Sequence, residues 1–443
     1  MTVLGLVFAG AIVLAVQRRG SAGLLTVVGA SVPFYDSAMF NVGPLAVSPY
    51  YVAVSLYVLN SLLTQDEERG RRGTAVAWFL LAYGIAITLV GPLIFAGQTV
   101  VGDAGVATQA FGRLEPLDYT ISNLAQAAYL TLNVLFIVTR PAQAEMLRVV
   151  RVAFVLGVGV ACAVALTPGA AVHSLFDNSA RNSYAVISEG LRERAQFAEP
   201  SHLGAFALAA SAYFALSLWR AGDVRQKLFD GALFLAALGL FVSAASGTGA
   251  AGAAAVLVAA FGVSVWQGIQ PETKISPVAA LSAVVVAIGA MLASPRIVSW
   301  ITSVISGRFE NRSGGIRSAE NDVAWRTMVD TWGLGVGLGS TRSSSLLLLL
   351  LASVGLFGTI LFLLLLAQSL ASGFAQESSR PVGMALVGTA AAAFASGGLL
   401  AAPVLWVLLA AGLSDRCQSA DCPPAWSIRP GGAGSLGGER NVG

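Results

Sequence analysis

The chain has 443 residues, of which 56% are hydrophobic and 11% charged, and its formal net charge is +3. Soluble globular proteins carry roughly 25% charged residues, so this chain has too few to cover a surface that faces water. The small net charge, without a basic run interleaved with aromatic residues, argues against nucleic acid as a partner. Three cysteines and two histidines form no ligand pattern, which predicts no metal and no cofactor.

Apolar blocks recur along the chain with lengths that suit a hydrocarbon core of about 30 Å. They predict an all-α, polytopic integral membrane protein with about 12–13 transmembrane helices. The expected spans are 2–16, 21–40, 45–63, 74–96, 120–138, 150–167, 202–219, 228–245, 249–266, 278–294, 343–367, 382–396 and 399–413. Together they form one transmembrane domain, 1–413, followed by a disordered cytoplasmic tail, 414–443. The first block lacks a basic flank and a cleavage site, so we expect it to be retained.

The basic residues predict which connections face the cytoplasm, because Lys and Arg in short loops are costly to translocate. The basic connections are Arg18-Arg19, 66–72, 140–151, 220–227, Lys274 and Arg380. The alternating connections, expected outside, are 34–44, 97–118, 167–200 and 295–342. This topology puts the N-terminus outside and the tail inside. The two large external loops, 167–200 and 295–342, are expected to carry short interfacial helices.

Ten of the 26 basic residues fall in the external segments, and all ten are arginine, against the positive-inside bias. Guanidinium groups bind phosphate or carboxylate bidentately and keep their charge at any working pH. The cluster therefore predicts an anionic ligand. The residues expected to bind it are Arg181, Arg194, Arg308, Arg317, Arg326 and Arg342. The alternative is that these are solvated charges, balanced by acidic neighbours.

The first motif lies where the 167–200 loop re-enters the membrane. Pro200 in a first turn, with Ser201 or the preceding residues as a cap, predicts the start of a helix. Such a helix N-terminus, with Arg194 beside it, is an anion site. Glu199 and His202 are each candidates for a proton acceptor. Alternatively, Glu199 only complements the helix dipole and His202 packs against loop backbone.

A second and a third motif follow each other in the 295–342 segment. The stretch 318–332 is amphipathic and predicts an interfacial helix, with Trp325 and Trp332 as membrane anchors. It would hold Arg317 and Arg326 above the lipid surface. In the following stretch, 333–342, glycine at every second position lets the backbone approach a ligand or another chain segment closely. No strand precedes this run, which excludes a dinucleotide-binding fingerprint.

These motifs, in this order, resemble the O-antigen ligase and polymerase superfamily over about residues 180–365. The segment from Arg194 to His202 resembles the family's "R, spacer, F, x, E-P-S/N" motif. Ser246-Gly247-Thr248-Gly249 is similar to its "S-R-x-G" turn, although the same residues read more simply as a helix-packing seam. The segment 351–358, LASVGLFG, is similar to the family's "L-x-E-x-G-l-x-G" span.

Two further positions bear on the resemblance. Arg317 stands 18 residues before Gly335 of the glycine run. Many members, ligases especially, have His-Asn just after that run, where this chain has Ser344-Ser345 behind Arg342. The departure favours a capsule or exopolysaccharide polymerase over a ligase. Asp36 lies in the first external loop, where some lipid-donor glycosyltransferases place a catalytic carboxylate, but a single carboxylate is a weak signal.

The resemblance implies a metal-independent, inverting glycosyltransferase of the bacterial inner membrane with its active site outside. A glycan on undecaprenyl diphosphate is the expected donor and a lipid-linked repeat unit the acceptor. Arg194 and Arg317, then Arg308 and Arg342, would stabilise the diphosphate, and Glu199 or His202 would deprotonate the acceptor. Membrane lipid, a chain-length regulator and a flippase are the other expected partners. The alternatives are a ligase to another acceptor, a transporter or flippase of lipid-linked sugars, and a non-catalytic assembly subunit. The chain shows no internal repeat of the kind usual in transporters.

Overall fold

The computed structural model describes residues 1–43, 45–64, 73–102, 114–167, 169–180, 192–244, 247–269, 312–395 and 400–414. This part of the chain is mostly helical, and six of its helices are long and apolar enough to cross a membrane, judged by length and composition. They are α3 (Thr74–Ile94), α4 (Ile121–Val138), α5 (Gln143–Leu166), α7 (Pro200–Arg220), α8 (Val224–Ala244) and α13 (Leu346–Ala375). Each overlaps a predicted span. The predicted span 278–294 lies outside the described residues.

Two long helices are kinked at glycines. The helix α1 (Val3–Ser31) bends at Gly20, where φ is 54° and ψ is −126°, and α13 bends at Gly355, where φ is 63°. A side chain is disfavoured at such angles, so glycine is the residue suited to these positions. The kink divides α1 into two short apolar helices, which correspond to the predicted spans 2–16 and 21–40.

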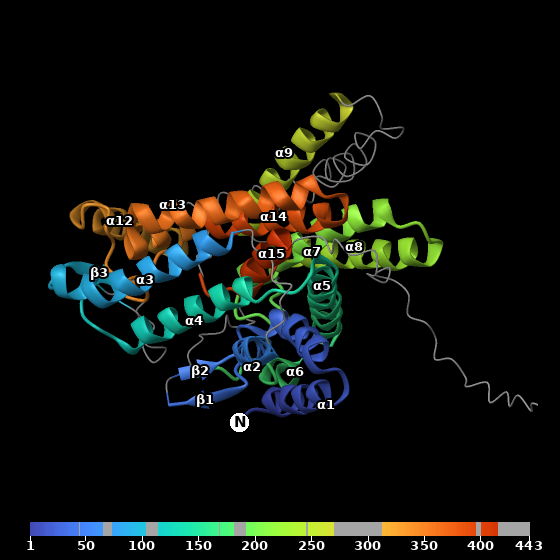
Figure 1. Ribbon diagram of the computed structural model, residues 1–443, viewed down its shortest axis with the longest axis horizontal. Helices are drawn as coiled ribbons and strands as arrows, with labels where there is room; N and C mark the ends of the chain where they lie inside the picture. The colour runs from blue at the N-terminus through green and yellow to red at the C-terminus, as the bar shows by residue number, and fades with distance from the viewer. Residues whose placement is uncertain are drawn as a thin grey trace, which may run out of the picture.

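The remaining helices of the described residues are between 3 and 23 residues long. They are η1 (Val32–Phe34), α2 (Pro49–Thr64), α6 (Ala170–Ser174), α9 (Gly247–Ile269), α12 (Arg312–Asp330), η2 (Glu377–Ser379), α14 (Arg380–Ala395) and α15 (Pro403–Leu413). The last helix lies inside the molecule, packed against α4, α5, α13 and α14 (Figure 1). Its Trp406 is fully buried and donates its indole N–H to Leu400 O at 2.6 Å. With 11 residues, α15 is too short to cross a bilayer.

Two small β-hairpins add to the helical fold, which the all-α prediction did not include. In the first, β1 (Phe40–Val42) pairs antiparallel with β2 (Leu45–Val47). In the second, β3 (Thr99–Val101) pairs with β4 (Leu114–Pro116). Strands of three residues are too short to show the alternation that marks a strand in a sequence.

Connections predicted to share a side contact one another. Among those expected outside, Ser37 Oγ donates to Phe176 O at 2.9 Å, and Arg342 N donates to Val101 O at 3.2 Å. Among those expected inside, Arg140 Nη2 donates to Leu413 O at 2.9 Å, next to the predicted tail. In Figure 1, α12 and β3 lie together at one end of the long helices α3 and α13. The side of the membrane that each connection faces stays a prediction.

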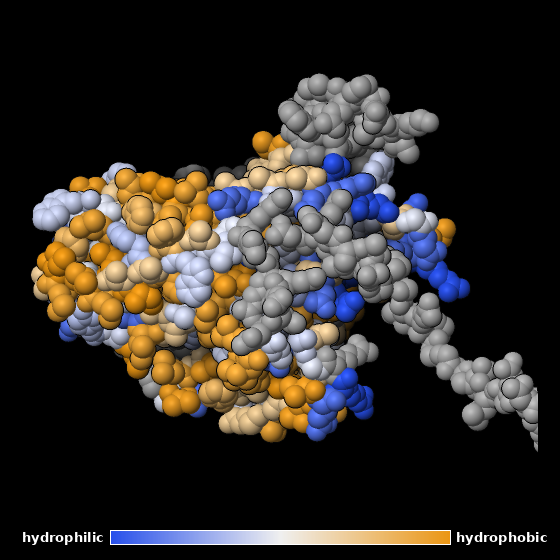
Figure 2. Space-filling model, viewed as in Figure 1, coloured by the Kyte–Doolittle hydropathy of each residue, from blue (hydrophilic) through white to orange (hydrophobic). Residues whose placement is uncertain are grey.

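The surface of the long helices is rich in apolar side chains. Leu89 and Leu93 of α3, Leu124 of α4 and Phe357 of α13 are each more than half exposed. Figure 2 shows hydrophobic residues over much of the visible face. Apolar areas of this extent indicate contact with something other than water, and with the six long apolar helices they suggest a membrane-embedded protein.

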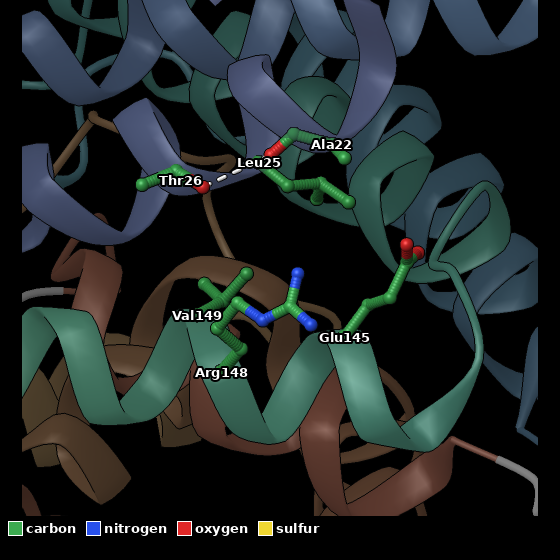
Figure 3. Close-up of a pocket in the computed structure, with 6 residues that line it drawn as sticks. All are labelled: Ala22, Leu25, Thr26, Glu145, Arg148 and Val149. Atoms are coloured by element: carbon green, nitrogen blue, oxygen red, sulfur yellow. Dashed lines mark hydrogen bonds between the residues drawn. The ribbon is translucent and has the colours of Figure 1, made fainter. Parts of the chain in front are cut away.

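A small cavity lies between α1 and α5, where Arg148 points toward the helix that carries Leu25 and Thr26 (Figure 3). Its volume of about 10 Å³ is near the lower limit for a single water molecule. Gly29 allows the two helices to touch, because a Cβ there would lie 2.6 Å from Val149 O. No residue predicted to bind substrate lines this cavity, so it belongs to the packing of α1 on α5.

Candidate functional site

The segment that precedes α7 is held in a tight loop by its own side chains. Ala195 has φ of 48°, in the left-handed region that a residue with a side chain seldom adopts. The Glu193 carboxylate accepts the N–H groups of Arg194 at 3.0 Å and Ala195 at 2.7 Å, and Phe197 N donates to Arg194 O at 3.0 Å. These bonds compensate for the strained angle and fix the approach of the chain to α7.

Arg194 is buried and bound to two partners. Its Nη1 lies 2.8 Å from Asp177 Oδ1 and its Nη2 lies 2.5 Å from Asp177 Oδ2, a bidentate ion pair. Nη1 also donates to Phe197 O at 2.9 Å. These contacts join Asp177, three residues after the end of α6, to the loop before α7. They give a clear structural role to the arginine that the sequence pattern favours most for substrate binding.

The helix α7 begins at Pro200, as predicted, with Glu199 as its N-cap residue in an extended conformation. The Glu199 side chain does not cap the helix; Ser201 Oγ instead donates to Glu199 Oε2 at 2.8 Å. A carboxylate at this position also interacts favourably with the positive end of the helix dipole.

The first connection folds onto the start of α7. Asp36, directly after η1, is 4% exposed. Its Oδ2 lies 2.7 Å from His202 Nδ1 and accepts Ala198 N–H at 2.9 Å. The Tyr35 ring lies 5.7 Å from the His202 ring and 6.0 Å from that of Phe197, measured between centroids. Asp36, which the sequence indicated only weakly, therefore contacts His202, one of the two candidate bases, directly.

Two of the predicted arginines, Arg317 and Arg342, also affect the pKa of Glu199. Burial raises the pKa of its carboxyl, but His202, the Ser201 hydroxyl, Arg317 and Arg342 lower it, and the net shift is downward. Glu199 is therefore ionised at neutral pH. Burial, Asp36 and Glu199 all raise the pKa of Tyr35 well above its ordinary value, so its phenol stays neutral. The structure thus brings together residues from the three predicted external segments 34–44, 167–200 and 295–342.

The glycine run, 333–339, determines the path of the chain from α12 to Arg342. Gly333, Gly335, Gly337 and Gly339 have φ of 73°, 87°, 98° and 75°. The run threads between α3, α4 and α13, and a Cβ would meet backbone atoms at 2.6 Å for Gly335 and 2.4 Å for Gly339. The sequence left open whether the glycines approach a ligand or another segment, and the structure shows that they approach other segments.

Hydrogen bonds hold the run in this passage. Val336 N donates to Ala352 O at 2.9 Å and Gly337 N to Ser353 O at 2.8 Å, both on α13. On the other side, Asn123 Nδ2 of α4 donates to Leu338 O at 2.8 Å. The run therefore serves as a rigid connection that ends at Arg342.

Two serines connect the segment after Arg342 to α12. Ser343 Oγ donates to Asn321 Oδ1 at 2.8 Å, and Ser344 Oγ donates to Glu320 Oε2 at 2.6 Å. Both partners lie within about one turn of Arg317 on α12. Ser344 thus helps to hold Arg317 and Arg342 on the same side of the molecule.

The other predicted site residues are not placed at this cluster. Arg326 is exposed on α12, and Trp325, Val329 and Trp332, on the same helix and just after it, are also exposed. Arg181 and Arg308 lie outside the described residues. Among the described residues, no group of three or more His, Cys, Asp or Glu side chains is placed to hold a metal ion.

Tyr35 was not among the predicted site residues, Asp36 carried little weight, and Asp177 was expected only as one of the acidic neighbours that balance the arginines. Asp36 contacts a histidine 166 positions later, and Asp177 pairs with an arginine across the long 167–200 loop. No local pattern predicts such pairs. The cue was chemical: a carboxylate at the edge of an apolar block needs a partner if it is buried.

Neither the known protein families nor the curated proteins include a match to this chain. The site therefore has to be interpreted from its own geometry and charge.

Proposed function

We propose that the protein extends a surface polysaccharide outside the bacterial inner membrane. It transfers a glycan from undecaprenyl diphosphate to a lipid-linked repeat unit. The observation that carries the proposal is the cluster of charges at the start of α7, where His202, Arg317 and Arg342 lie close enough to Glu199 to lower the pKa of its carboxyl. These side chains come from two segments that the charge pattern places on the outer side.

The chemistry needs a site for a developing negative charge. Cleavage of the bond between the anomeric carbon and the phosphate oxygen leaves the electron pair on the diphosphate. Arg317 and Arg342 would stabilise that charge, each by a few kcal/mol if held in place beforehand. Glu199 or His202 takes the proton of the acceptor hydroxyl as its oxygen attacks the anomeric carbon, and this single displacement inverts the carbon.

The position of α12 suits a ligand anchored in lipid. The exposed side chains of Trp325, Val329 and Trp332 supply an apolar face that can rest on the membrane interface. Arg317, on the same helix, would then stand near the height of lipid headgroups, where the diphosphate of a polyprenyl carrier lies.

Arg194 has a supporting part in this proposal. Its ion pair with Asp177 fixes the loop that presents Glu199. Substrate binding falls instead to Arg317 and Arg342, with Arg308, Arg181 and Arg326 as further candidates from the sequence.

The test is the replacement of Arg317 and Arg342 by lysine in the native host, followed by electrophoresis of the surface polysaccharide. Lysine keeps the charge but loses the bidentate fork, so we expect loss of long chains and accumulation of a single lipid-linked repeat. Arg225→Lys, at an exposed position of α8, is the matched control and should leave the pattern unchanged. Normal chain lengths in both site variants would overturn the proposal, and free long chains would indicate a ligase.

A further inference from the structure

We propose that Asp36 holds His202 as an imidazolium cation, which serves as a third cation of the diphosphate site beside Arg317 and Arg342. Glu199 is then the base. This inference rests on the proposed function and deepens it, because it divides the roles of two residues that the sequence left interchangeable.

The hydrogen bonds define which ring nitrogen meets a ligand. Asp36 Oδ2 accepts from Ala198 N at 2.9 Å and lies 2.7 Å from His202 Nδ1. An ionised carboxylate can only accept hydrogen bonds, so Nδ1 carries a proton. Nε2 is the nitrogen left to contact substrate.

The charges around the ring favour its protonated form. Asp36, from the segment after η1, contacts the ring, and Glu199, at the N-cap of α7, attracts a positive charge on it. Arg317, from α12, opposes that charge, as does the positive end of the α7 dipole. Tyr35, beside the ring, is neutral. Burial of the ring is the largest effect against its charge, and the two carboxylates, one of them in direct contact, outweigh burial, one guanidinium group and a helix end.

The protonated ring also changes the charge of the site. A neutral His202 contributes no charge to this cluster, whereas an imidazolium adds one positive charge beside Arg317 and Arg342. A diphosphate is attracted to positive potential, so the charge on the ring favours its binding.

The roles in the reaction follow. Nε2–H donates to a phosphate oxygen and stays protonated throughout. The acceptor hydroxyl loses its proton to Glu199 while its oxygen bonds to the anomeric carbon. The bond from that carbon to the phosphate oxygen breaks, and the electron pair remains on the diphosphate.

The first test is nitrogen NMR of full-length protein in lipid nanodiscs with ¹⁵N-labelled histidine. The chain has only two histidines, and His173→Gln assigns the signals. We expect both ring nitrogens of His202 to be protonated at neutral pH, and one proton to be lost in Asp36→Asn. Asparagine keeps an oxygen for Ala198 N–H but removes the charge. A neutral His202 ring in the wild type would overturn the inference, and this outcome does not depend on whether Asp36→Asn folds.

The second test measures the binding of inorganic pyrophosphate to the protein by ³¹P NMR. Loss of a charged hydrogen bond predicts an affinity about 10- to 100-fold lower in His202→Gln, and a similar loss in Asp36→Asn with partial rescue in Asp36→Glu. His173→Gln is the control. If Arg317→Lys and Arg342→Lys weaken binding and His202→Gln does not, the inference falls and the proposed function stands. If neither arginine variant weakens binding, the proposed function falls as well.

Discussion

Arg194 shows how one side chain can match a functional motif and yet be used by the fold. Its charge is buried with that of Asp177, whose side chain is 23% exposed, in a bidentate pair. Removing one member leaves a charge without its partner in a poorly hydrated place. The ion pair thus gives Arg194 a role in stability whether or not it touches substrate.

We therefore predict that Asp177→Asn lowers the free energy of unfolding by about 2–3 kcal/mol, less than a fully buried pair because Asp177 is partly exposed. Thermal unfolding in detergent measures this loss. The double variant Asp177→Asn, Arg194→Met should be more stable than Asp177→Asn alone. Equal unfolding temperatures for wild type and Asp177→Asn would contradict the structural role.

Glu199 should give the protein a pH dependence of known sign. Its pKa is lowered by folding from an ordinary value of 4.5, so its ionised form stabilises the fold above that pH. The contribution is lost as the pH falls through the lower, folded pKa. The unfolding temperature of the wild type should drop more steeply below pH 4.5 than that of Glu199→Gln. Parallel curves would contradict the charge cluster.

Glu199→Gln should also reduce polymerisation by about 10²- to 10⁴-fold, because general base catalysis contributes on that scale. The measurement is chain extension in membranes supplied with lipid-linked repeat units. Chain extension at the wild-type rate would exclude Glu199 as the base.

At the scale of elements, the glycine run is the connection that positions Arg342 relative to α12. Its left-handed angles let the chain pass between α3, α4 and α13 without side chains. The run leads from the end of α12 to Arg342 and so couples helix packing to the position of a residue proposed to bind substrate.

Gly335→Ala and Gly339→Ala should each destabilise the protein by at least about 2 kcal/mol, because both the angle and the added methyl are unfavourable. Gly315→Ala is the matched control. It lies on α12, where an added Cβ would meet no atom of the described residues within 4 Å outside its own helix backbone, and alanine there should stabilise by about 0.5–1 kcal/mol. Unfolding temperatures compare the three variants. Equal effects would mean that the run is not packed as described.

At the scale of the whole molecule, the four connections predicted outside lie near one another. The β1 hairpin contacts the 167–200 segment through Asn41 and Asn178, Arg317 and Arg342 lower the pKa of Glu199 in that segment, and the Arg342 backbone contacts β3. A site assembled from all these segments can face only one side of a membrane.

Cysteine labelling tests that side. With the three native cysteines replaced, Val42→Cys and Leu114→Cys, both exposed, should react with an impermeant maleimide from outside. Gly222→Cys, between α7 and α8 with open space around it, should react only after lysis. Labelling of Val42→Cys and Leu114→Cys from opposite sides would contradict the fold, and labelling of both from the cytoplasm would end the proposed function.

The sequence by itself determined the long apolar helices, the start of α7 at Pro200 and the gathering of arginines in a few connections. These features depend on local composition and on signals within a few residues, such as apolar length and proline in the first turn. The two hairpins were too short to leave such a signal.

Only the tertiary structure decided which charged groups meet. Asp36 reaches His202, Asp177 takes Arg194, and the glycine run is occupied by neighbouring helices instead of a ligand. Each of these contacts joins positions far apart in the chain, where the energy comes from packing and from pairing buried charges. Sequence periodicity does not predict these pairs, because the partner of each group depends on how distant segments pack in the folded chain.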